Sequence, residues 1–413
     1  MASGPRDGIG LAVRDFFLRH RVVLLSIVLS ALGFVTGPAT MAAYLQRFSP
    51  FETSLLLAGA ALAGVVALLQ TRHLALAILM AMAPLPGLAW AAPLAGDASY
   101  GAVPFLAYGF GFAVAAFAAD DIVLRVLEDA PSRLPLRAVA AALGLMAALA
   151  AAWFWRSRLS AIAIQAVADT LLATLSVLIV VPLGAYFLPF DESFIARANR
   201  AREWRERTLE ALAAVATPRW GLSFGGIALI VLALAWFGAQ PAFASISVYG
   251  IPVLSVAATV AAAAVFLFAL AAGAGWRGSL AASVVCVSAG LMALWGCAVT
   301  RSVPPWALAA VIELVVLAAF AIFCAAARAG GEREDDSAGP RAVEETGAPQ
   351  FFAMLGAAAA LAPSLIHQKN YAVYEIALLL AGIGALILAP ALAAAIDALL
   401  PRRRSVEELY GRS

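Results

Sequence analysis

Six acidic residues lie within or at the edges of strongly apolar stretches, and these are the residues that could do chemistry. They are Asp120, Asp121, Asp169, Glu313, Glu375 and Asp397. A carboxylate is costly to bury in apolar surroundings, so a buried one is a candidate for binding protons, ions or a polar ligand. Glu375 and Asp397 lie near the ends of their stretches, where contact with water explains their charge. The other four are the stronger candidates.

Asp120 and Asp121 directly follow the apolar sequence GFGFAVAAFAA. Two adjacent carboxylates repel each other in low-dielectric surroundings, which favours proton binding by one of them near neutral pH. A proton relay needs that property. The apolar residues resume as IVLRVL, so the sequence predicts a helix that continues about two turns beyond the pair. The alternative is that the pair ends the helix, with Arg125 as the solvated partner of Asp121.

Asp169 and Glu313 are possible intramembrane polar sites. Asp169 lies about ten residues into an apolar stretch, beside Gln165 and Thr170. It is either a second relay or ligand site, or a polar contact between helices. Glu313 lies about eight residues into a different stretch and has no neighbouring charge.

Several other kinds of chemistry are not supported. The 3 cysteines lie inside apolar runs without a paired spacing, and the 3 histidines flank apolar runs without clustering. We therefore expect no metal site and no cofactor. No GxxxxGK[ST] motif occurs, so the chain carries no ATPase site of its own. No nucleophile, base and orienting group fall at helical spacings, which disfavours an enzyme.

The elements that must position these carboxylates are membrane-spanning helices. Of the 413 residues, 64% are apolar and only 13% are charged, which excludes an ordinary soluble protein. A span needs about 20 apolar residues. Twelve such runs occur, at approximately 22–45, 53–70, 74–95, 101–119, 137–155, 160–189, 220–238, 248–272, 279–299, 305–327, 350–366 and 372–397.

The distribution of charge predicts the orientation of the chain. Most of the 27 basic residues fall on one side when both termini are placed in the cytoplasm, as the positive-inside bias requires. Residues 191–219 form a helix-like, charged connector, which we expect to lie along the inner membrane face. Residues 329–349 are acidic and rich in Gly and Pro, which is typical of a flexible linker. The net charge of only +2 does not support nucleic-acid binding.

The two halves of the chain are predicted to be repeats of six helices each. LIVVPLGAYFLP, which ends the sixth run, resembles LILAPALAAAIDALLP, which ends the twelfth, and this alignment places Pro182 on Pro390. Six is an even number, so both halves enter the membrane from the same side and are parallel repeats. The prediction is an all-α, polytopic membrane protein with repeats at 1–190 and 220–413.

Several stretches resemble the membrane domain of the resistance-nodulation-division (RND) superfamily, including its mycobacterial-membrane-protein-large (MMPL) branch. They are FFLRHRVVLLSIVLSALGF, ALAGVVALLQTRHLALAILMAMAPL, GFGFAVAAFAADDIVLRVLEDAPSRLPLRAVAAAL and the run ends at Pro182 and Pro390. The resemblance implies that Asp120 and Asp121 match the family's proton-translocation pair. Family members carry large extracytoplasmic porter domains after the first and seventh spans, where this chain has only short segments. The family's charged position in the tenth span is uncharged here.

Two functions follow as hypotheses. The first is a proton-driven, RND/MMPL-like transporter of the bacterial inner membrane, which moves a lipid-like or hydrophobic substrate. A separate periplasmic or membrane partner protein would then replace the missing porter domains. The alternative is a scaffold or sensor subunit that does not transport and uses the same helix bundle to bind partners or lipids. A major-facilitator-type carrier ranks lower, because LLQTRHLALA lacks that family's loop signature.

Overall fold

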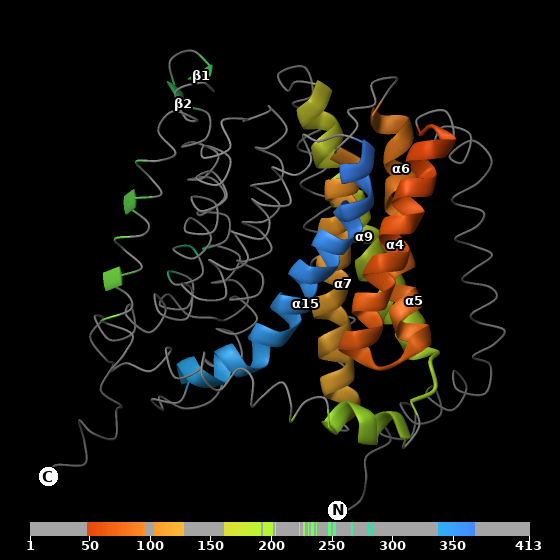
Figure 1. Cartoon of the computed structure of the whole chain (residues 1–413), viewed down its shortest axis with the longest axis vertical. Coiled ribbons are helices and arrows are strands. Elements are labelled where there is room, and N and C mark those ends of the chain that lie inside the picture. Colours follow the sequence, from red (N-terminus) through yellow and green to blue (C-terminus); the bar gives the residue numbers. More distant parts are fainter. Residues whose placement is uncertain are drawn as a thin grey trace, which may run out of the picture. The chain divides into compact units, whose positions relative to one another are not determined.

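The computed structural model describes residues 48–95, 103–127, 161–190, 193–200, 247–248, 251–252 and 338–367, with single positions between 203 and 283. The chain divides into two compact units. The first unit contains Met1–Ala201 and Phe352–Tyr371, and the second contains Arg202–Phe351 and Ala372–Ser413. Most of the described helices belong to the first unit (Figure 1).

Helix α4 covers Pro50–Thr71 and begins with a capping box. The Ser49 hydroxyl accepts a hydrogen bond from the backbone N–H of Glu52 at 3.2 Å, and the Glu52 carboxylate accepts one from the backbone N–H of Ser49 at 2.9 Å. These bonds satisfy donors that a helix start leaves open, and Pro50 costs nothing there because its missing N–H needs no partner. The helix ends where Arg72 adopts a left-handed conformation with φ of 55°.

Helices α5 and α6 form one membrane-length segment with a break in it. They cover Leu74–Met82 and Pro84–Ala95. The break falls at Ala83 because Pro84 has no N–H to donate into the preceding turn and its ring clashes there. The sequence predicted a single uninterrupted run at 74–95, and the structure divides it at this proline.

Helix α7 covers Val103–Leu127 and is the central helix of the first unit. In its span, 94% of the residues are buried, compared with 39% in the span of α4. Figure 1 shows α7 among α4, α5, α9 and the upper part of α15. Side chains on every face of α7 therefore contact protein, and we expect that few of them meet lipid.

Helix α9 covers Ala161–Tyr186 and contains Pro182, and α15 covers Ala338–His367. The sequence predicted a flexible linker over 329–349. Residues 338–349 are helical and form the first part of α15, while the division of the chain that includes this linker stays a prediction. The segment can be helical because Pro340 falls in the first turn, where a missing N–H breaks no bond, and the good helix formers Ala and Glu follow.

Small residues bring the helices of the first unit into backbone contact. A side-chain carbon added to Gly59 of α4 would overlap the carbonyl oxygen of Ala360 in α15. One added to Gly87 of α6 would overlap the carbonyl oxygen of Leu172 in α9. Only glycine fits at both places. Such contacts are typical of helix packing in membranes, where van der Waals contact replaces the hydrophobic driving force.

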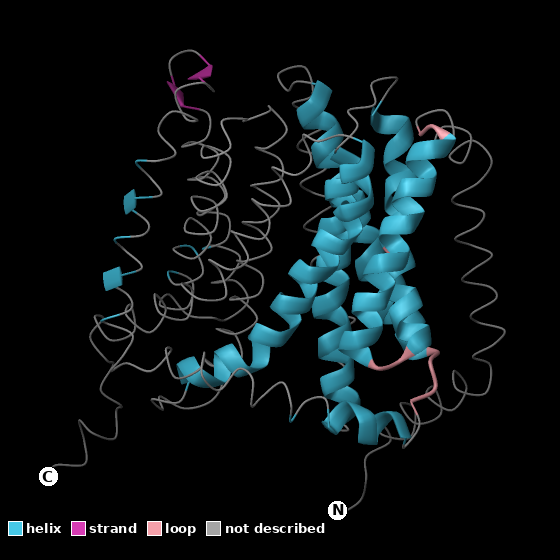
Figure 2. Cartoon of the chain, in the orientation of Figure 1, coloured by secondary structure: helices cyan, strands magenta, loops and turns pink. Residues whose placement is uncertain are grey.

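Little of the second unit is described. Strands β1 (Ser247–Val248) and β2 (Ile251–Pro252) pair antiparallel, with Ser247 opposite Pro252 and Val248 opposite Ile251. Figure 2 shows that, apart from this short pair, the regular structure in the described part of the chain is helical.

Four described segments are long and apolar enough to cross a membrane. They are Pro50–Thr71, Leu74–Ala92, Val103–Val123 and Ala168–Ala185. The chain is therefore a helical membrane protein, as its composition predicted. The described part does not extend to all twelve runs, so the twelve-span arrangement and the two repeats stay predictions.

Candidate functional site

The Asp120–Asp121 pair lies within α7 and does not end it. The helix continues to Leu127, which confirms the predicted continuation of about two turns beyond the pair. Asp120 is 8% exposed, and Asp121 is half-buried. Adjacent residues on a helix do not face the same direction. The pair therefore presents one carboxylate to the bundle interior and one toward its edge.

Gln70 reaches α7 from the last turn of α4. Its Nε2 donates a hydrogen bond to the carbonyl oxygen of Ala116 at 2.9 Å, and the residue is 4% exposed. Ala116 lies four residues before Asp120, so the two share one face of α7. The Oε1 atom of Gln70 is buried and has no hydrogen-bond partner in the part of the chain that the structure describes. A polar amide thus lies beside the helical turn that carries Asp120.

The proline break between α5 and α6 is held by two hydroxyl groups from different helices. Tyr108 of α7 donates to the carbonyl oxygen of Ala81 at 2.7 Å. Ser176 of α9 donates to the carbonyl oxygen of Ala83 at 2.6 Å. All of these groups are buried. These hydroxyls give the backbone around the break hydrogen bonds to two neighbouring helices, as polar backbone in an apolar interior requires.

Asp169 forms a separate polar site on α9. It is fully buried, and Nε2 of Gln165 lies 3.4 Å from its Oδ2. Ala168, which directly precedes Asp169, packs with the Trp90 side chain of α6 in one apolar cluster. The indole Nε1 of Trp90 is buried without a hydrogen-bond partner among the described residues. Asp169 and the Trp90 indole are thus two buried polar groups of the first unit, and the role of Asp169 as a site residue stays a prediction.

The structure does not bring Asp120 and Asp169 together. Helices α7 and α9 run in the same direction, and Gly111 of α7 lies against Ala173 of α9 (Figure 1). Asp120 comes nine residues after Gly111, and Asp169 comes four residues before Ala173. At a rise of about 1.5 Å per residue, the two carboxylates are about 20 Å apart along the bundle. They are two sites on different levels.

An aromatic cluster closes the end of the bundle near Gln70. The imidazole of His73 lies 5.3 Å from the rings of both Phe190 and Phe194. Its Nδ1 accepts a hydrogen bond from the backbone N–H of Leu76 at 3.2 Å, and its Nε2 lies 3.3 Å from the carbonyl oxygen of Pro189. The ring is the N-cap of α5. Because Nδ1 accepts the bond from Leu76, Nε2 is the ring nitrogen placed to donate to Pro189.

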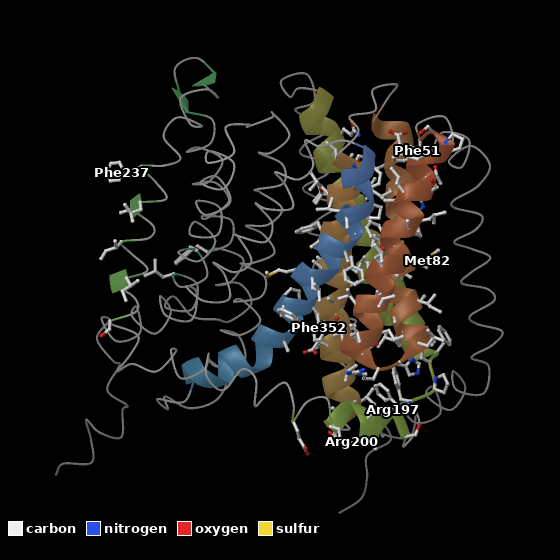
Figure 3. The ribbon with its side chains drawn as sticks, viewed as in Figure 1. Phe51, Met82, Arg197, Arg200, Phe237 and Phe352 are labelled. Atoms are coloured by element: carbon white, nitrogen blue, oxygen red, sulfur yellow. The ribbon has the colours of Figure 1, made fainter. Side chains whose placement is uncertain are left out.

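The helical residues 193–200 lie across this end of the bundle. Phe194 and Ala198 are buried, and Arg197 and Arg200 are exposed (Figure 3). Buried residues four apart and charged residues three apart divide the segment into an apolar and a basic face. The predicted connector over 191–219 contains this segment. Its predicted position on the inner membrane face stays a prediction.

Some predicted site residues lie outside the described part of the chain, and some residues at the site were not predicted. Glu313, Glu375 and Asp397 lie outside the described residues. Gln70, Tyr108 and Ser176 were not identified as site residues from the sequence, since each makes a contact with a distant helix that composition does not reveal. One signal was present for Gln70, which is the only amide in the apolar run at 53–70.

Comparisons of the chain with protein-family models, with curated proteins and with solved structures gave no match. The resemblance to the RND superfamily therefore stays a prediction from the quoted sequence stretches.

Proposed function

We propose that this chain is a proton-coupled membrane transporter, in which Asp120 takes up and releases protons. The observation that carries the proposal is the burial of α7 on all its faces together with a carboxylate on that helix. A central helix contacts several neighbours at once, so a change of charge on it alters several helix contacts together. Carboxylates buried in a membrane protein are typical of proton pathways.

The two members of the pair have different roles in this proposal. Asp120 binds the proton in the interior, where losing charge removes a large desolvation cost. Asp121 is more exposed and exchanges protons with the aqueous side. When Asp120 binds a proton, the interface between α4 and α7 loses a negative charge. When Asp120 releases the proton, the charge returns. The free-energy difference between these states is what a transporter uses to drive a conformational change.

The proposals about the substrate and the helix arrangement are supported by the sequence patterns. We propose an RND/MMPL-like arrangement of twelve helices in two parallel repeats, placed in the bacterial inner membrane with both termini in the cytoplasm. A lipid-like or hydrophobic substrate is proposed because the chain has no extracytoplasmic segment of domain size at the two positions where the family carries porter domains. A separate periplasmic or membrane protein is the proposed partner.

Proton flux into liposomes that contain the purified chain tests this proposal. An imposed pH gradient and an internal pH-sensitive dye report the flux for the wild type and for the double variant Asp120→Asn/Asp121→Asn. We expect the double variant to lose about 100-fold in flux, because removing an acid–base group costs a factor of that order. The matched control is Glu203→Gln, which neutralises an exposed carboxylate and should leave the flux unchanged.

Two outcomes would contradict the proposal. Equal flux in the wild type and the double variant would exclude the pair as the relay. No flux in a folded wild type, with substrate-like lipid present in the vesicles, would exclude proton coupling. The second outcome favours the alternative function, a scaffold or sensor subunit that binds partners or lipids.

A further inference from the structure

The Gln70 amide is a polar group at a helix interface with one of its two ends unused. Its Nε2 is bonded to the Ala116 carbonyl at 2.9 Å, whereas its Oε1 is buried and has no partner within the described ranges. A buried acceptor without a donor costs free energy, so such groups are rare unless a function retains them. Gln70 lies in the last turn of α4, and its side chain is directed to the central helix.

The Ala116 carbonyl determines which end of the amide is unused. Exchanging the two ends would place Oε1 against another oxygen acceptor, and two acceptors at hydrogen-bond distance repel. The nitrogen must therefore face Ala116. The oxygen is then the end that is available for a donor.

Asp120 is the ionisable group next to this oxygen along α7. In an α-helix the carbonyl of Ala116 points at the backbone N–H of Asp120, four residues later. Helix side chains also lean toward the N-terminus of their helix, so the Asp120 carboxyl leans toward the turn that Gln70 contacts. Adding these helix and amide dimensions places Oε1 within roughly 8 Å of the Asp120 backbone nitrogen. The Asp120 side chain covers part of that distance, and a direct hydrogen bond or one bridging water covers the rest.

We infer that Gln70 is a positioning residue of the proton site, whose Oε1 accepts a hydrogen bond from the protonated Asp120 carboxyl, directly or through one water. An ionised carboxylate has only acceptors and gives nothing to Oε1, while the protonated acid has one O–H to donate. Gln70 thus recognises the protonated state alone. The proton arrives from the aqueous phase, forms an O–H bond on Asp120 and leaves by the same bond. This inference rests on the proposed function in requiring that Asp120 binds a proton.

Thr71, the residue after Gln70, provides the matched comparison. It is also buried, but its hydroxyl donates to the carbonyl oxygen of Ala67 in its own helix at 2.8 Å and lies 3.3 Å from the carbonyl oxygen and 3.4 Å from the backbone nitrogen of His73. These bonds stay within α4 and the turn that leads to α5, and none of them reaches α7. Two neighbouring polar residues at the end of one helix thus differ in whether they reach the central helix.

Infrared difference spectra of the whole chain in liposomes, recorded at acidic and neutral pH, test the inference. A carboxylic acid absorbs at lower frequency when it is hydrogen-bonded than when it is free. The band of protonated Asp120 is identified by its loss in Asp120→Asn. In Gln70→Met, which keeps the shape and removes both polar atoms, we expect this band to move to higher frequency and proton flux to fall about tenfold. In Thr71→Val, the band should stay in place.

Gln70→Asn is the second variant, for use if Gln70→Met does not fold. It keeps the amide and withdraws the oxygen by one carbon, so the band should move in the same direction. An Asp120 band that is unchanged in the Gln70 variants, or that moves equally in Thr71→Val, would overturn the inference. The absence of an Asp120 band at every pH would also overturn it. Proton flux is measured separately, so a flux that persists with an unmoved band rejects the role of Gln70 and leaves the proposed function standing.

Discussion

Helices α4 and α7 are similar in length and in apolar character, yet they have opposite surroundings. One side of α4 is exposed, and large apolar side chains cover it: Phe51, Leu57, Leu62, Val65, Leu68 and Leu69. In α7, almost every side chain between Val103 and Val123 is buried by other helices. The comparison teaches that apolar composition identifies a membrane span but does not tell whether lipid or protein surrounds it.

The positions of small residues reflect the different surroundings of α4 and α7. The buried side of α4 has Gly59, Ala60 and Ala63, and α7 has alanines and glycines along most of its length. Large residues on α4 therefore face outward and small ones face inward, while α7 needs small residues on several sides. We expect the exposed side of α4 to contact lipid, where side-chain volume is not constrained.

The largest effect should follow from filling the closest contact of α4. In Gly59→Leu the new side chain meets the backbone carbonyl of Ala360, which cannot move aside as a side chain would. We expect a loss of about 3 kcal/mol in the free energy of unfolding, at the upper end of the usual cost of overpacking. Denaturation of the purified protein in detergent measures it. A loss below about 1 kcal/mol would mean that the two helices are not in backbone contact.

The next effect compares one substitution on the two helices. Ala115→Leu adds volume at a fully buried position of α7, and Ala58→Leu adds the same volume on the exposed side of α4. We expect the first to cost about 1–3 kcal/mol and the second to stay within about 0.5 kcal/mol. The same detergent denaturation assay measures both. Equal costs would contradict the different surroundings of the two helices.

A smaller effect should follow from removing hydroxyl groups. Ser176→Ala leaves the carbonyl of Ala83 without its donor at the proline break, so we expect a loss of about 1–2 kcal/mol. Ser54→Ala is the matched control, because the Ser54 hydroxyl is exposed and bonds its own helix at Phe51. Its loss should be within about 0.5 kcal/mol, since water replaces the bond. If Ser176→Ala and Ser54→Ala lost equal free energy of unfolding, the proline break would not depend on hydroxyl groups from other helices.

The smallest effect should come from the exposed face itself. Val65→Ala on α4 removes two methyl groups from a side chain that is 57% exposed. We expect a change within about 0.5 kcal/mol, because no cavity forms where lipid or detergent fills the space. A loss of 2 kcal/mol or more would require a protein contact on this face of α4.

Much of the described fold could be predicted from run lengths. The runs predicted at 53–70 and 160–189 correspond to α4 and α9 within a few residues, because apolar length and charge set the ends of a span. The break at Ala83 was missed because Pro84 lies inside an unbroken apolar run, and only the local backbone shows its consequence. The helix over 338–349 was not predicted, since composition alone does not exclude a helix that a neighbouring apolar segment can extend.

The candidate site was predictable only in part. A carboxylate in an apolar run is visible in the sequence, and Asp120 and Asp169 are both buried. Their separation along the bundle was not predictable, because it depends on how α7 and α9 pack at Gly111 and Ala173. The role inferred for Gln70 depends on a hydrogen bond across 46 positions of sequence, which no local pattern contains.

The proline break also has a mechanical consequence. It divides one span into two rigid rods, of which α5 is joined to α4 by the short turn at Arg72 and His73, and α6 is held against α9 at Gly87. Bending between the rods stretches the two hydroxyl bonds at Ala81 and Ala83. The stiffness of this membrane segment therefore depends in part on two side chains of other helices, and a change in either one would alter how easily the span bends at its middle.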